Sequence, residues 1–193
     1  TIVALLSLIS LFDPALGQIN KNKAVPEDAG EHFDKPDSTV VAYPNGDIYR
    51  AGKFKRFWFG NNYREEWVTP IEIPLFDFRN EKGEMKIIKE GGSFQTSALR
   101  LEDEEGKEWV LRSLDKNASA VIPENIRTGM AEDIVQDQMS ASNPYGAFAV
   151  PGIAEAAGIL HTNPRLVYLD IIYLPAGFSD KWEGIYLFEE RPD

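Results

Sequence analysis

Three apolar stretches in the middle of the chain are separated by short polar connections. They are Met85–Lys89, Ser97–Leu101 and Glu108–Leu114, joined by residues 90–96 and by the acidic turn 102–107. Connections this short join neighbouring antiparallel strands, whereas a parallel pair needs a crossover of a dozen or more residues. The pattern therefore predicts an antiparallel meander of three strands over residues 85–114.

The spacing of the apolar positions becomes helical after Pro123-Glu124. We expect a helix of about four turns over residues 125–140, because apolar residues there recur every three or four positions. Its predicted buried residues are Ile126, Met130, Ile134 and Val135, and its predicted end is Ser142-Asn143-Pro144. Pro151–Gly158 predicts a second, short helix. The expected fold is α+β: an antiparallel meander sheet with one long and one short packed helix.

The remaining pattern adds elements on both sides of this middle part. On the N-terminal side we expect a hairpin of residues 40–44 and 47–50 around Asn45-Gly46, because Asn-Gly favours a type I′ turn. Residues 54–59 have helical spacing that Gly60 can end, and the prolines of segment 70–78 predict an edge strand or a traversing segment. On the C-terminal side, residues 166–174 and 184–188 predict strands.

The first twelve residues form an apolar run that Asp13-Pro14 interrupts. The run has the length of a signal-peptide core and is short of the ~20 residues that span a bilayer. Ala15-Leu16-Gly17 supplies the small residues of a cleavage site. We expect a signal peptide at 1–17, a linker at 18–38, and an α+β module at 39–193 that is truncated at its C-terminal end.

Charge and cysteine content narrow the classes of partner. The net charge is −11, which argues against nucleic acid and against anionic lipid, since both attract basic surfaces. The chain has no cysteine, so disulfide and thiolate chemistry are excluded. We expect export to the periplasm or outer membrane of a Gram-negative bacterium, with contact to the membrane only through parts beyond this sequence.

The connection between the first two predicted strands has the residues of an anion-binding turn. Adjacent glycines let a backbone close over phosphates, and exposed N–H groups bind their oxygens. A Gly-rich turn, a cation on the third strand and an acidic helix together are the layout of a kinase small lobe. The candidate residues are Gly91, Gly92, Ser93, Gln95 and Thr96 in the turn, Arg112 and Lys116 as counter-charges, and Glu132 or Asp133 as the partner of such a cation. A glycine hairpin with solvated cations is the alternative interpretation.

Other chemical candidates have simpler explanations. His161 precedes a strand and has no nucleophile motif nearby, which favours a loop histidine over a base. Residues 102–105 are acidic but lack the alternating ligands of a calcium loop, so we expect a solvated turn and no metal site. The aromatic residues Phe57, Trp58, Phe59, Tyr63 and Trp67 form either a ligand platform or, as we favour, core or a docking surface.

Two stretches carry a resemblance to a known family: residues 91–101 continuing through 109–116, and residues 182–190. They resemble large exported Gram-negative proteins described as surface antigens or phosphoesterases, over roughly residues 45–193. The resemblance implies a module that precedes a C-terminal outer-membrane β-barrel, with that barrel or another envelope protein as partner. More distantly, the order of parts is similar to the spore-coat protein H kinase-like family.

The departures from these families limit the expected activity. A calcineurin-like phosphoesterase needs several Asp, His and Asn ligands around two metals, and this chain has only His32 and His161. A kinase needs a catalytic Asp on its large lobe, which would lie beyond Asp193. We expect a structural or interaction role without a cofactor. The alternative is a kinase-like domain that binds ATP or another anion, and the third is part of an envelope phosphoesterase whose catalytic domain is elsewhere.

Overall fold

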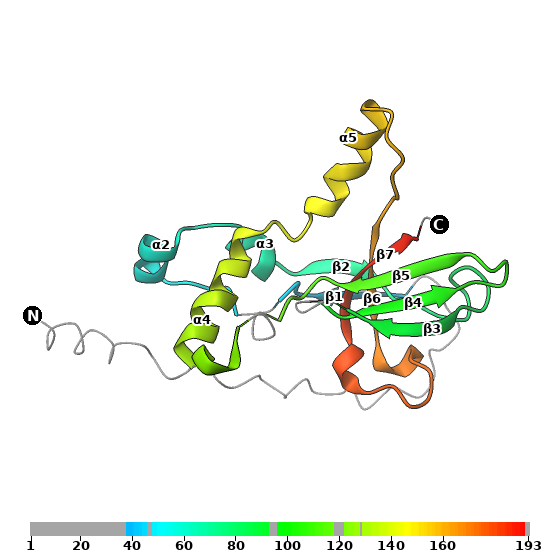
Figure 1. Cartoon of the computed structure of the whole chain (residues 1–193), viewed down its shortest axis with the longest axis horizontal. Helices are drawn as coiled ribbons and strands as arrows, with labels where there is room; N and C mark the ends of the chain where they lie inside the picture. The colour runs from blue at the N-terminus through cyan, green and yellow to red at the C-terminus, as the bar shows by residue number, and fades with distance from the viewer. Residues whose placement is uncertain (1–37, 46–47, 93–95, 118–121, 128, 192–193) are drawn as a thin grey trace, which may run out of the picture. The chain divides into compact units, whose positions relative to one another are not determined.

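The computed structural model describes residues 38–45, 48–92, 96–117, 122–127 and 129–191. Its central element is a five-stranded antiparallel sheet with the strand order β3-β4-β5-β7-β6 (Figure 1). The strands are β3 (Lys86–Gly91), β4 (Ala98–Glu102), β5 (Glu108–Ser113), β6 (Arg165–Leu169) and β7 (Gly184–Glu190). The predicted signal peptide, and the predicted linker up to residue 37, lie outside the described residues.

The predicted meander is confirmed in β3, β4 and β5, which pair in chain order. The strand predicted over 184–188 is also confirmed, but β7 lies between β5 and β6 rather than at an edge. The strand predicted over 166–174 ends at Leu169. Asp170 follows, and its side chain accepts a hydrogen bond from the Ile172 N–H at 3.0 Å, which caps a short 3₁₀ turn in place of further strand.

One face of this main sheet carries the larger hydrophobic core. Leu99 pairs with Leu111, and Leu111 pairs with Phe188, so their side chains lie on the same face. All three are 1% exposed or less. Aromatic and aliphatic residues outside the central strands close the core, namely Phe76, Phe78, Met85 and Trp182. Burial of each such side chain contributes about 1.5–3 kcal/mol of hydrophobic free energy.

A two-stranded sheet of β1 (Thr39–Ala42) and β2 (Ile71–Pro74) lies beside the main sheet. The prediction of a hairpin between residues 40–44 and 47–50 was therefore wrong, although Gly46 and Asp47 themselves lie outside the described residues. Tyr49, instead of extending a strand, is fully buried against Trp67, with ring centroids 5.2 Å apart. The proline-flanked segment after residue 70 is a short strand, and Leu75 then forms a parallel bridge to Tyr168 of β6.

The helices are α2 (Lys53–Phe59), α3 (Arg64–Val68), α4 (Gly129–Gln138) and α5 (Val150–Ala156). Short 3₁₀ turns accompany them at Glu124–Ile126, Met139–Ala141, Gly146–Ala149, Ile171–Tyr173 and Asp180–Trp182. The predicted helix over 54–59 is confirmed, and Gly60 ends it with a φ of +82°. The predicted short helix over Pro151–Gly158 corresponds to α5, but α5 contains no buried residue, so the expectation that it packs against the sheet was wrong.

Helix α4 confirms the predicted long helix but not its buried face. It begins at Gly129 rather than at residue 125, and it continues as a 3₁₀ turn to Ala141. Ile134 is 43% exposed, while Asp137 is 3% and Ser140 0% exposed. The predicted burial of Ile134 was wrong, because polar contacts orient this helix. Val135 is half-buried, and the side chains of Ile126 and Met130 are not among those described.

Candidate functional site

The glycine turn between β3 and β4 is the first candidate. Gly91 is the last residue of β3, and Gly92 has a φ of +135°. A Cβ at Gly92 would lie only 2.1 Å from the carbonyl oxygen of Thr96, so the backbone approach requires glycine. Ser93 and Gln95 lie outside the described residues. The geometry of the hairpin therefore explains the glycine at position 92 without any bound anion.

Strand register brings part of the predicted anion site together. Gly91 pairs with Ala98, and Ala98 pairs with Arg112, so the glycine and the arginine lie in one row across three strands. The Arg112 side chain is 58% exposed, and its Nε lies 3.3 Å from Oε1 of Glu189 on β7. The Arg112 side chain, which was predicted to bind an anion, therefore already forms an ion pair with Glu189 of the same sheet.

Lys116 follows β5 at the same end of the sheet. Its carbonyl oxygen accepts a hydrogen bond from Nε2 of Gln136 at 3.0 Å, which connects this segment to α4. The ion pairs among the described residues join neither Glu132 nor Asp133 to Arg112 or Lys116. The acidic helix thus contacts the end of the sheet through an amide rather than a carboxylate.

Asp115 lies between these two cations in the sequence and contacts the Nδ2 of Asn45. Surrounding protein desolvates its carboxyl group and raises its pKa to about 6, although much of the residue surface is exposed. A hydrogen bond from the Lys116 backbone lowers the pKa by less than desolvation raises it. Asp115 therefore changes charge close to neutral pH.

A groove of about 900 Å³ lies between the opposite face of the main sheet and the segment around α5. The α5 side is apolar, and its lining includes Val150, Ile153, Ile159 and Leu160. The sheet side contributes Val110, Arg112, Glu189, Glu190 and Arg191. His161 also lines the groove, and its Nδ1 lies 3.3 Å from the Thr162 carbonyl oxygen, a contact typical of a loop histidine.

The charged residues on the sheet side of the groove are paired with one another or with neighbouring strands. Arg112 contacts Glu189, Lys107 contacts Glu190 at 2.9 Å, and Arg191 contacts Glu108. Each of these charges has a partner of opposite sign, so a ligand does not need to carry a charge to bind the groove. The part of the groove that lacks a partner among the described residues is the exposed apolar surface on the α5 side.

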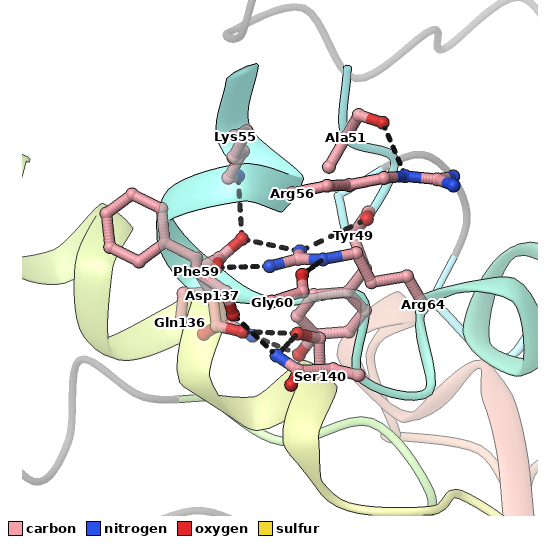
Figure 2. Close-up of polar contacts among 11 residues, drawn as sticks. Tyr49, Ala51, Lys55, Arg56, Phe59, Gly60, Arg64, Gln136, Asp137 and Ser140 are labelled. Atoms are coloured by element: carbon pink, nitrogen blue, oxygen red, sulfur yellow. Dashed lines mark hydrogen bonds and ion pairs between the residues drawn. The ribbon is translucent and has the colours of Figure 1, made fainter. Parts of the chain in front are cut away.

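A second polar cluster joins α2, α3 and α4, and Figure 2 shows its contacts. Arg64 donates to both carboxylate oxygens of Asp137, at 2.7 and 2.6 Å, and both side chains are almost fully buried. Lys55 of α2 contacts the same carboxylate at 2.7 Å. Asn62 donates to the Ser140 hydroxyl at 3.0 Å, and Arg64 also donates to the Gly60 carbonyl at 3.1 Å.

The electrostatics of this cluster favour a structural role. Burial alone would raise the pKa of Asp137, but hydrogen bonds from Arg64 and Lys55 outweigh that effect and hold the pKa below its ordinary value. The carboxylate thus stays ionised between two cations. A bidentate arginine–carboxylate pair is geometrically specific, which explains why Asp137 rather than Ile134 faces the protein.

The acidic turn and the aromatic residues have separate roles. Asp103 caps its own turn by accepting hydrogen bonds from the N–H groups of Glu105 and Lys107, and from the indole of Trp109 at 2.8 Å. This agrees with the predicted turn. Of the aromatic set, Trp67 is core at 1% exposure, whereas Phe57 and Trp58 are 80% and 65% exposed. The five aromatic residues therefore do not form one platform.

Sequence reasoning missed the Arg64–Asp137 pair and the groove. The pair joins residues 73 positions apart, and no local pattern links a charged residue in one helix to a specific partner in another. The apolar residues of the α5 segment were visible in the sequence. The sequence predicts a packed helix over Pro151–Gly158, whereas the apolar side chains Val150 and Ile153 are exposed.

Comparison with known proteins gave no match: no family model, no curated protein and no solved structure resembles the chain closely enough to indicate a family. Within the part of the chain that the structure describes, no helix is long and apolar enough to cross a membrane.

Proposed function

We propose that this domain is an interaction module of a larger exported envelope protein, and that its groove binds an amphipathic helix from another domain of that protein. One observation carries the proposal: α5 contains no buried residue, although its sequence is predominantly apolar. Val150, Ile153 and Ile159 are 56%, 69% and 63% exposed, and Leu160 is fully exposed. Contiguous apolar surface of this kind typically marks an interaction site.

The two sides of the groove define the chemistry of the occupant. The α5 side offers apolar side chains, and burial of one such side chain contributes about 1.5–3 kcal/mol. The sheet side offers charged groups of both signs that already have partners. An amphipathic helix, apolar toward α5 and polar toward the sheet, satisfies both sides, as in other helix-in-groove complexes.

Site-specific crosslinking in the host cell tests this function. A photoreactive residue at Ile153 should crosslink to another part of the same exported polypeptide. The matched control is Ile172, which is 60% exposed but outside the groove. Equal crosslinking at the two positions, or no product at Ile153, would contradict the groove as a binding site. A product with a different protein would contradict the proposed source of the helix.

Substitutions then measure the contribution of the groove. Leu160→Asp should weaken association by ~1.5–3 kcal/mol, because it removes an apolar contact and introduces a charge. Ile172→Asp should leave association unchanged. Thermal unfolding of both variants should stay near that of the unsubstituted chain, since both side chains are exposed.

A kinase-like anion site at the end of the sheet is the second candidate. The observation that favours it is the row formed by Gly91 and Arg112, with Lys116 at the same end. The meander β3-β4-β5, followed in the chain by α4 and then by β6 and β7, also supports the small-lobe layout that the resemblance implies. The ion pair of Arg112 with Glu189 weighs against it.

Calorimetry with ATP, ADP and inorganic phosphate tests the anion site. If the site exists, Arg112→Ala should weaken binding by ~1–3 kcal/mol, the usual contribution of a charge-assisted contact. Glu189→Gln should strengthen binding, because it releases Arg112 from its partner. Absence of binding in both the unsubstituted chain and Glu189→Gln would exclude this candidate.

A further inference from the structure

Helix α2 presents an aromatic face that nothing in the described part of the chain covers. Phe54, Phe57 and Trp58 lie at helical positions i, i+3 and i+4, which share one face of a helix. They are 63%, 80% and 65% exposed. Their rings contact one another edge to face, with Phe54–Trp58 and Phe57–Trp58 centroids 6.4 and 5.6 Å apart. We refer to these three residues as the aromatic patch.

The polar cluster attaches α2 to the rest of the domain, and Figure 2 shows its contacts. Lys55 lies on the inner side and contacts Asp137 at 2.7 Å. The Gly60 N–H donates to the Arg56 carbonyl at 2.9 Å, and the Asn62 side chain donates to the Phe59 carbonyl at 3.2 Å. Lys55 thus attaches α2 to α4, and the two hydrogen bonds cap the C-terminal end of the helix, while the three aromatic side chains stay exposed.

The exposed charges of α2 have one sign. Residues 48–64 contain five of the 20 Lys and Arg residues of the chain and none of its 31 Asp and Glu residues. Lys55 and Arg64 of this segment contact Asp137, whereas Lys53 and Arg56 are exposed. Lys53 flanks the patch along the helix, and Arg56 lies one turn further. The chain as a whole has a net charge of −11, but this segment is positive. An anionic surface therefore attracts the segment locally, although it repels the rest of the molecule.

We propose that the aromatic patch of α2 binds the interface of a bilayer that contains anionic phospholipid. Trp and Phe side chains favour the headgroup boundary, and Lys and Arg beside them attract anionic headgroups. This contact is reversible and peripheral, since it inserts three side chains of a short helix into the interface. The net charge of the whole chain argues against binding to anionic lipid. The exposed charges of α2 have the opposite sign to that net charge, so this expectation does not apply to α2.

The positions of the tryptophans allow a direct test. Trp67 and Trp182 are buried, Trp109 is half-buried against Phe188, and Trp58 is 65% exposed. We expect vesicles of phosphatidylcholine and phosphatidylglycerol with brominated acyl chains to quench the emission of Trp58. Trp58→Phe should remove this quenching while vesicle binding continues, and pure phosphatidylcholine vesicles should give little quenching.

Sedimentation with the same vesicles separates the two contributions. Lys53→Glu should weaken binding by about tenfold or more, since each charge near an anionic surface contributes roughly fivefold. Phe57→Ser with Trp58→Ser should weaken binding by a similar or larger factor. Ile172→Ser is the control, because Ile172 is an apolar side chain that is 60% exposed and lies in neither the aromatic patch nor the groove.

The comparison of variants within the full chain also controls for the apolar run at residues 1–12, which is present in every variant. Equal quenching in the unsubstituted chain and Trp58→Phe would overturn the proposal. Unchanged sedimentation of the Phe57→Ser, Trp58→Ser variant would overturn it as well. Binding of α2 to a protein, with Trp58 unquenched by brominated lipid, would assign the patch to a protein partner and also reject the lipid surface.

Discussion

The main sheet and the layer of helices α2, α3 and α4 are stabilised in different ways. In the sheet, Leu99 and Leu111 occupy paired positions on one face, and both are fully buried. In α4, by contrast, Asp137 and Ser140 are buried and Ile134 is exposed. The sheet follows its hydrophobic pattern, whereas the helix follows a bidentate ion pair with Arg64.

The difference has a physical origin. A β-strand has two faces and a period of two, so burial of one face determines the direction of every side chain. A helix can rotate about its axis at little local cost, and its orientation depends on contacts with other elements. A buried charge without a partner costs several kcal/mol, so the position of Arg64 decides which face of α4 turns inward.

The largest expected effect comes from breaking this ion pair. Arg64→Ala should lower the free energy of unfolding by about 3–5 kcal/mol, because it leaves Asp137 buried without its main partner. Urea denaturation measures the change. Lys55→Ala should cost less, since the Lys55 side chain is 28% exposed and Arg64 remains. Equal losses for the two variants would show that the helical layer does not depend on the buried pair.

The apolar core of the sheet provides the matching test. Leu111→Ala should destabilise by about 2–5 kcal/mol, through lost burial and the cavity that remains. Val41→Ala is the control on the small sheet, where the side chain is 66% exposed and the expected change is within about 0.5 kcal/mol. A small loss for Leu111→Ala would contradict the assignment of the main core to this face.

Asp115, at the end of β5, gives a pH-dependent effect. Its folded pKa of about 6 exceeds the ordinary value of 3.8, so the folded state binds more protons and stability falls as the pH rises from about 4 through 6. Asp115→Asn should therefore unfold at higher temperature than the unsubstituted chain at pH 8 and at nearly the same temperature at pH 3. A variant that is less stable at pH 8 would indicate that the carboxylate is stabilising.

The smallest expected effect is at Ile134. Because this side chain is 43% exposed, Ile134→Asp should change the free energy of unfolding by about 0.5 kcal/mol or less. If Ile134 were buried, as the hydrophobic pattern predicted, the same change would cost several kcal/mol, because it would bury an unpaired charge. Urea denaturation of Ile134→Asp and Leu111→Ala thus compares the two regions directly. A large decrease in the free energy of unfolding for Ile134→Asp would show that the apolar face of α4 is a packing surface.

Local pattern was sufficient for part of the order of elements, whereas the Asn45-Gly46 turn signal predicted a hairpin that β1 does not form. Alternation and short connections determined β3, β4 and β5, and helical spacing ended by Gly60 determined α2. The strand over 184–188 was also recognisable. These features depend on neighbours within a few residues, so a single sequence contains the information that specifies them.

Only the tertiary structure decided the long-range pairings. It placed β7 between β5 and β6, and it paired β1 with β2 instead of with the segment after Asn45. It also brought Arg64 to Asp137 and paired Arg112 with Glu189. Each of these contacts joins residues far apart in the chain, where many partners of similar chemistry compete and local propensity does not distinguish among them. The orientation of α2 follows from the same contacts, and it exposes aromatic residues that the sequence alone could equally assign to the core.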